Sequence, residues 1–159
     1  MSEHTTYSLE QMSAAMKSVF DSGGEFRFYP RGTSMLPLIR QGLDSIALVA
    51  APAMPRKRDI LLYVRPGGAY VLHRVLGCDD DGYILCGDNQ TVPEHGVKPE
   101  QIRGVLAAVY RGRRQVRCNV VSFRYRVYST LWCFMPLRRL CLFTRRCVVR
   151  VKKLILQIK

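Results

Sequence analysis

The sequence predicts a mainly β fold with flanking α structure, on three observations. One segment near the N-terminus has apolar residues at helical spacing. From residue 25 onward, apolar and polar residues alternate in short runs that are separated by turns rich in Gly, Pro and Asp. After residue 112 the chain becomes strongly basic. We therefore expect an N-terminal helix within residues 1–24, an antiparallel β domain over 25–112 and a basic amphipathic segment over 113–159.

The first expected element is a short helix over residues 8–21. It begins with a Ser-Leu-Glu-Gln capping pattern, and Gly23 and Gly24 mark its end. Four apolar residues fall on one face: Leu9, Met12, Met16 and Phe20. Such a stripe is typical of core packing, so we expect no functional site on this helix.

The β domain is expected to consist of short strands joined by turns. The clearest runs cover residues 26–29, 46–49, 60–64, 70–76, 83–86 and 102–110. Many short strands with frequent turns are typical of an antiparallel sheet. Within residues 116–128 the apolar pattern leaves both strand and helix open.

The charge of the chain is unevenly distributed. The formal net charge is +13, yet residues 1–100 hold all 12 acidic residues and 10 basic ones, a net charge of −2. Residues 101–159 hold 15 basic and no acidic residues, a net charge of +15. The first region can carry a folded core, while the second predicts a phosphate-bearing partner, which is either a lipid surface or a nucleic acid.

The basic segment has the pattern of an amphipathic helix. Its longest stretch without a charge, residues 127–137, is far shorter than the roughly 20 residues that span a bilayer. One helical face carries Leu137, Leu140, Thr144, Val148, Val151, Ile155 and Ile158, and another carries Arg139, Arg146, Arg150 and Lys153. We expect residues 129–159 to contact an anionic membrane surface. The alternative is a helix that packs on the body and exposes a basic face.

The cysteines do not have the spacing of a metal site. None of the six forms a C-x-x-C pair, and no histidine lies at zinc-ligand spacing from them. We therefore expect no metal, and we expect free thiols in a reducing compartment.

The loop over residues 30–37 contains a candidate nucleophile. Gly32 frees the backbone before Ser34, and Pro37 stiffens the exit. A serine held in this way exposes its Oγ and a backbone N–H that can face a developing oxyanion. The alternative is an ordinary turn serine, and a nucleophile would need a base elsewhere in the chain.

His73 is the candidate base, because it lies within an apolar strand and is largely neutral at about pH 7. The alternative is a partly buried structural histidine. A base works best when a third group holds its other nitrogen, and Asp88 and Glu94 are the two acidic candidates.

Five segments in order resemble the characteristic boxes of the type I signal peptidases, serine peptidases whose core is similar to the LexA-type repressors. They are Gly32-Thr33-Ser34-Met35-Leu36-Pro37, Arg58-Asp59-Ile60-Leu61-Leu62-Tyr63, Val71-Leu72-His73-Arg74-Val75, Gly87-Asp88-Asn89-Gln90 and Ile102-Arg103-Gly104-Val105. The resemblance covers about residues 28–110. Histidine followed by Arg-Val resembles the endoplasmic-reticulum branch, which is shared with archaea and some Gram-positive bacteria.

The resemblance implies a role for each site residue. Ser34 would be the nucleophile and His73 the base, and either Asp88 or Glu94 would orient the imidazole. The second acid is an aspartate in that branch, and here it is a glutamate. Oxyanion stabilisation and substrate binding would fall to the residues around the nucleophile, which are Gly32, Thr33, Met35 and Pro37.

The resemblance also implies the substrate class and the location. Substrates would be leader or signal peptides cleaved after small residues, with no metal or organic cofactor. The family's N-terminal membrane anchor is not found, and we expect the basic segment over 129–159 to replace it. Free thiols favour the cytoplasmic face of a membrane, while the family implies the outer face.

Two other functions fit parts of the pattern. One is a non-catalytic module on the same fold that binds a membrane or a nucleic acid, although we favour a membrane over nucleic acid as the partner. The other is a LexA-like self-cleaving regulator. The histidine at position 73 disfavours the regulator, because that class uses a lysine as its base.

Overall fold

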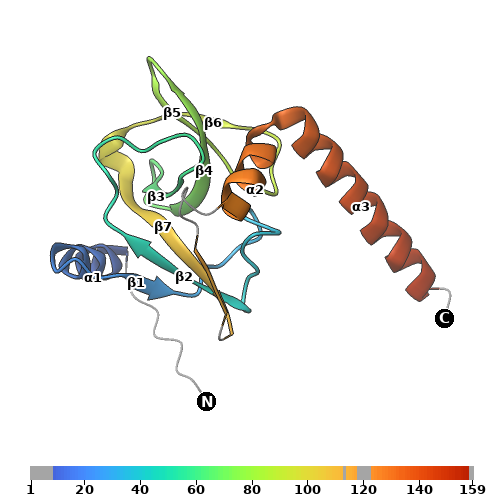
Figure 1. Cartoon of the computed structure of the whole chain (residues 1–159), viewed down its shortest axis with the longest axis horizontal. Helices are drawn as coiled ribbons and strands as arrows, with labels where there is room; N and C mark the ends of the chain where they lie inside the picture. Colours follow the sequence, from blue (N-terminus) through green and yellow to red (C-terminus); the bar gives the residue numbers. More distant parts are fainter. Residues whose placement is uncertain (1–8, 113, 118–122, 158–159) are drawn as a thin grey trace.

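The computed structural model describes residues 9–112, 114–117 and 123–157. Within these residues eight strands form one antiparallel sheet, in the order β1-β2-β7-β3-β4-β5-β6, and β8 pairs with β7 off this path. Helix α1 lies at one end of the sheet, and helices α2 and α3 lie on the other side of the molecule (Figure 1). The mainly β fold with flanking helices is confirmed.

The elements follow the chain in a simple order. They are α1 (Leu9–Asp21), β1 (Phe26–Phe28), β2 (Asp44–Val49), β3 (Ile60–Val64), β4 (Tyr70–Asp79), β5 (Gly82–Cys86), β6 (Glu94–Val97), a 3-10 turn (Pro99–Gln101), β7 (Ile102–Arg111), β8 (Arg114–Arg117), α2 (Phe123–Cys133) and α3 (Met135–Gln157). The predicted helix and the six predicted strands are all present, with bounds that differ by up to three residues.

Two strands are not among the predicted ones. The four residues of β6 have no apolar alternation, and only Val97 is buried. Their strand conformation comes from pairing with β5, in which Tyr83 lies opposite Val97 and Leu85 opposite Glu94. The second strand, β8, falls partly within the segment whose structure the sequence left open. Pairing across a sheet therefore overrides weak local preference at both places.

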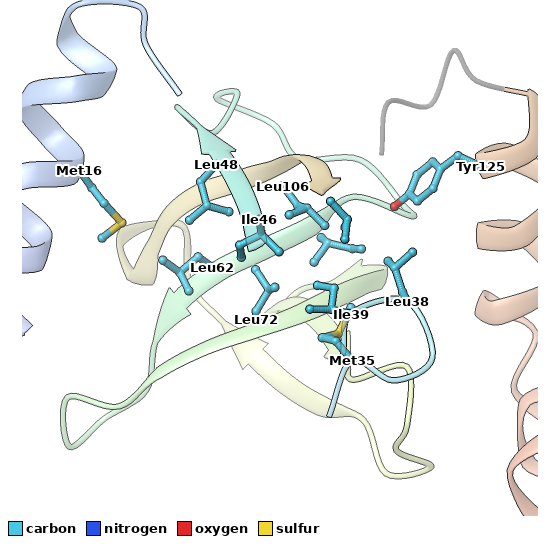
Figure 2. Packing of buried hydrophobic residues seen from close by; sticks show 12 residues of the cluster. Met16, Met35, Leu38, Ile39, Ile46, Leu48, Leu62, Leu72, Leu106 and Tyr125 are labelled. Carbon is cyan, nitrogen blue, oxygen red and sulfur yellow. The ribbon is translucent and has the colours of Figure 1, made fainter. Parts of the chain in front are cut away.

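The sheet is covered on both faces, and β3 shows this in its alternation. Ile60 and Leu62 belong to the larger core cluster, while Leu61 and Tyr63 belong to a smaller one on the opposite face. Figure 2 shows the larger cluster, into which Met16 of α1 and Tyr125 of α2 both project. α1 and α2 therefore contribute to the same core cluster from opposite ends of the molecule.

The serine loop is anchored in this larger cluster. Met35, Leu38 and Ile39 all lie within five residues after Ser34, and each is less than 10% exposed. Figure 2 shows them at the edge of the cluster nearest α2 and α3. Burial of three apolar side chains fixes the loop next to the sheet.

Helix α3 leaves the body after its first turns and projects away from the sheet (Figure 1). Arg138 and Leu142 are buried against the body. Beyond the first turn, the described part of the predicted apolar face is exposed: Leu140 is 59%, Val148 53% and Val151 53% accessible, whereas Leu137 in the first turn is half-buried. This face is therefore not the one that packs on the body. None of the described helices combines the length and the apolar character that crossing a bilayer requires.

Candidate active site

A cavity of about 190 Å³ lies between the serine loop and strand β4. Ser34 and His73 both line it, together with Gly32 and Met35 from the predicted site. Arg65, which the sequence did not single out, and Gln90 of the Gly-Asp-Asn-Gln box also line it, and its remaining lining residues are Pro30, Arg31, Ile39, Tyr70, Val71 and Leu72. The structure thus brings the hydroxyl and the imidazole, 39 residues apart in the chain, to one cavity.

A buried carboxylate holds the far end of the serine loop. Asp44 is fully buried and accepts hydrogen bonds from the backbone N–H and the guanidinium of Arg40. Arg111 donates to Asp44 as well and also to the carbonyl of Leu38, at 2.7 Å. Burial alone would raise the pKa of Asp44, but Arg40 and Arg111 outweigh that effect and lower it. The carboxylate is therefore charged and ties the C-terminal end of the loop to β2 and β7.

Gly87 is the point where the serine loop meets the imidazole. A Cβ at this position would lie 2.7 Å from the carbonyl oxygen of Ser34 and 3.0 Å from Nε2 of His73. The backbone N–H of Asn89 donates to the same Ser34 carbonyl at 2.7 Å. Only a residue without a side chain fits between the two groups, which places His73 Nε2 close to the backbone of Ser34.

The other ring nitrogen of His73 is held by a tyrosine. His73 Nδ1 lies 3.1 Å from the hydroxyl of Tyr63, and that hydroxyl donates to Oε2 of Glu94 at 2.7 Å. Arg65 donates to both carboxylate oxygens of Glu94. Since the Tyr63 proton goes to Glu94, the hydroxyl oxygen must accept from Nδ1–H of His73. Nε2, on the serine side, then carries the lone pair that a base needs.

The ionisation of these groups agrees with this proton arrangement. Burial lowers the pKa of His73 to about 4, although the charge of Glu94 partly opposes the shift. Burial would raise the pKa of Glu94, but hydrogen bonds from Arg65 and Tyr63 lower it below its usual value. At neutral pH the imidazole is therefore neutral and the carboxylate charged.

Asp88 lies in a different set of contacts. It is fully buried and receives a bidentate pair of hydrogen bonds from Arg74, at 2.8 and 2.7 Å. Tyr128 of α2 donates to the same carboxylate at 3.1 Å, and Arg138 of α3 lies 3.8 Å from it. Of the two acids predicted to orient His73, only Glu94 is linked to the ring by described hydrogen bonds, and the link runs through Tyr63.

The remaining predicted residues occupy the serine loop without lining the cavity. Thr33 accepts a hydrogen bond from the backbone of Leu36, and the carbonyl of Pro37 accepts one from Arg111. Within the described residues, no hydrogen bond joins Ser34 Oγ to His73. Catalytic hydrogen bonds are often long before substrate binds and tighten in the substrate complex.

Besides Arg65, three contributors to the site have no role assigned from the sequence. Tyr63 has the pattern of a core residue, and only the pairing of β3 with β4, which sets Leu61 opposite His73, brings its hydroxyl to the ring. Trp132 and Arg138 lie more than 40 residues beyond the loop that they contact. Tyr63 could have been found from the strand alternation, whereas no local pattern signals the other two.

Comparison of the chain with protein-family models, with curated proteins and with solved structures finds no match.

Proposed function

We propose that this protein is a serine endopeptidase of the signal-peptidase type that uses Ser34 and His73. The proposal is supported by the geometry of the cavity. Ser34 and His73 both line it, and the hydrogen bond of His73 Nδ1 to Tyr63 leaves Nε2 able to accept a proton on the serine side. The reaction class, hydrolysis of a peptide bond, is inferred from the five sequence boxes, which resemble those of the type I signal peptidases.

The proposed reaction has two proton-coupled steps. Ser34 Oγ attacks the scissile carbonyl while His73 Nε2 takes the hydroxyl proton, and the backbone N–H of Ser34 stabilises the oxyanion. The C–N bond then breaks, and the same proton passes to the leaving amine. Water repeats the sequence on the acyl-enzyme and regenerates Ser34.

Tyr63 and Glu94 are assigned the positioning of the base. The imidazolium that forms after proton transfer keeps its Nδ1–H on the Tyr63 oxygen, while Glu94 supplies a nearby negative charge. This arrangement replaces the direct contact between imidazole and carboxylate with a relay through one hydroxyl. Asp88 is assigned to holding the loop instead, because its partners are Arg74 and the C-terminal helices.

The proposed substrates are leader or signal peptides with small residues before the cleaved bond. The volume of the cavity, about 190 Å³, is consistent with small side chains. No metal or organic cofactor enters the proposed reaction.

An acylation experiment tests the nucleophile. We expect a fluorophosphonate probe to label the wild-type protein on Ser34, and Ser34→Ala to abolish the labelling. The matched control is Ser18→Ala, an exposed serine on α1, which should label like wild type. Equal labelling of Ser34→Ala and wild type would exclude the assigned nucleophile. An unlabelled wild-type protein that still binds vesicles would favour the non-catalytic module.

We also propose that the C-terminal segment holds the peptidase at an anionic membrane surface. The apolar residues Leu140, Phe143 and Val148 are all more than half exposed along α3, and no acidic residue follows residue 100. A projecting helix with exposed apolar residues and surrounding cations is typical of interfacial binding.

A vesicle-binding experiment tests this second part. We expect the protein to sediment with phosphatidylcholine vesicles that contain phosphatidylserine, and less so at high salt, because exposed charges are screened. The triple change Leu140→Ser, Val148→Ser and Val151→Ser should abolish sedimentation, whereas Leu43→Ser, at an exposed site on the body, should not. Undiminished sedimentation of the triple variant would contradict the proposal.

A further inference from the structure

The two C-terminal helices contact the backbone of the loop over residues 87–89. The indole Nε1–H of Trp132, near the end of α2, donates to the carbonyl of Asp88 at 2.7 Å. The guanidinium Nη1 of Arg138, in the first turn of α3, donates to the carbonyl of Gly87 at 3.1 Å. Arg138 also donates through Nε to the carbonyl of Trp132 at 2.7 Å, so the two residues form one unit.

The opposite side of the same loop contacts the candidate catalytic pair. Asn89 donates its backbone N–H to the carbonyl of Ser34, and Gly87 separates that carbonyl from Nε2 of His73. The loop is therefore enclosed between the helices on one side and the two reacting groups on the other. A shift of the loop would change the relative positions of Ser34 and His73.

The burial of Arg138 indicates that its hydrogen bond to the Gly87 carbonyl has a role beyond filling space. Arg138 is fully buried, and a buried guanidinium is costly unless it is paired. Asp88 is the buried carboxylate near it, but Asp88 already pairs with the fully buried Arg74. Arg138 Nη2 has no hydrogen-bond partner among the described residues. An apolar residue would fill this site at a lower electrostatic cost, but it could not bind the Gly87 carbonyl.

We infer that Trp132 and Arg138 are positioning residues, which hold the loop over residues 87–89 and through it set the distance between Ser34 and His73. The inference rests on the proposed peptidase function for its catalytic consequence. The structural part of the inference does not depend on that function: the C-terminal helices hold the loop over residues 87–89 in place beside Ser34 and His73. The same helices would then serve both membrane contact and the alignment of the reacting groups.

The test uses Trp132→Phe in the full chain, which keeps an aromatic ring and removes the indole donor. We expect hydrogen exchange of the Asn89 amide to accelerate about tenfold, with exchange in β3 unchanged, because the loop loosens locally. The acylation rate of Ser34 should fall about tenfold, with the KM for a peptide substrate unchanged. Leu131→Ala, at an exposed neighbour on α2, is the control.

A second pair of variants keeps the inference testable if one variant unfolds. Arg138→Gln should accelerate Asn89 exchange as Trp132→Phe does, and Arg139→Gln at the exposed neighbouring position should not. Unchanged Asn89 exchange in both Trp132→Phe and Arg138→Gln would overturn the inference. If Asn89 exchange is faster in the variants but the wild-type protein is not acylated, the two residues do hold the loop and the proposed peptidase function is wrong.

Discussion

The two acidic residues of the loop region, six positions apart, serve two different networks. Asp88 is fully buried and pairs with the fully buried Arg74, and its other partners come from α2 and α3. Glu94 pairs with Arg65 nearer the surface, where the two side chains are 29% and 43% exposed, and its network ends on His73. Asp88 therefore connects the sheet to the C-terminal helices, while Glu94 is connected through Tyr63 to the imidazole of His73.

This difference shows that spacing in a motif does not assign a role. A carboxylate that is surrounded by guanidinium groups in the interior is committed to them, because breaking such a pair leaves an uncompensated buried charge. A carboxylate with one exposed cationic partner can also accept the Tyr63 proton and so set the tautomer of His73. Variants that change one network and leave the other intact test this difference in role.

The largest effect is expected from the buried network. Asp88→Asn removes the charge that Arg74 requires and should lower the free energy of unfolding by about 3–5 kcal/mol. Asp80→Asn, at an exposed turn, should change it by no more than about 0.5 kcal/mol. Urea unfolding of both variants provides the measurement. If the two variants were equally stable, Asp88 would not be the structural acid.

The next effect is a dependence of stability on pH. Burial holds the pKa of His73 at about 4 in the folded protein, against an ordinary value of 6.5. The unfolded chain therefore binds more protons between these values, and stability should fall by about 3 kcal/mol as the pH drops from about 6.5 to about 4. Urea unfolding in steps across this range should show the loss.

The control for the pH experiment is His73→Gln, which has no titrating ring. This variant should keep a nearly constant free energy of unfolding down to about pH 4.5. Below that pH, protonation of Asp44 and Glu94, whose pKa values are also lowered, destabilises both proteins. Matching pH profiles for the variant and the wild type would show that His73 is not the group responsible.

A third effect is expected where the two networks meet. Gly87→Ala would place a Cβ 2.7 Å from the Ser34 carbonyl and 3.0 Å from His73 Nε2, so the two groups must move apart. The acylation rate of Ser34 should fall by about 100-fold. Gly77→Ala is the control, because a Cβ there has open space and the backbone is not in the left-handed region. An active Gly87→Ala protein would contradict the assigned geometry.

The smallest effect is expected from the relay itself. Tyr63→Phe keeps the packing of the ring but removes the hydroxyl between Glu94 and His73. Acylation of Ser34 should slow about tenfold, because the loss is that of one positioned hydrogen bond. Tyr83→Phe serves as the control, since Tyr83 lies on β5 outside this relay. Equal acylation rates for the two variants would remove Tyr63 from the site.

Much of the fold could be predicted from sequence because local patterns determine it. Residues 60–64 form β3 with the predicted bounds, since a run of apolar β-forming residues lies between a basic turn and a Pro-Gly-Gly turn. The separate helix α2 could not be predicted. Its residues are mostly aromatic, β-branched and basic, and contacts with the sheet through Tyr125 stabilise it.

The candidate site also contains residues that local sequence identifies and residues that it does not. Ser34 and His73 could be named from their local sequence, because a glycine-flanked loop and an apolar strand mark the two positions. The partners of Asp88 could not, because Arg138 is 50 residues away and belongs to a segment whose charges suggest a solvated surface. Ion pairs between distant segments depend on the packing of whole elements, and single-sequence patterns carry no record of that packing.

Because α3 projects from the body, small movements at its base become large movements at its far end. Its 23 residues form a rod about 35 Å long, because an α-helix rises 1.5 Å per residue. A tilt of about 5° at the root beside Arg138 would therefore displace the far end by about 3 Å. The free thiol of Cys147 is exposed on this rod, so a reporter attached there would amplify small rearrangements at its base into a readable signal.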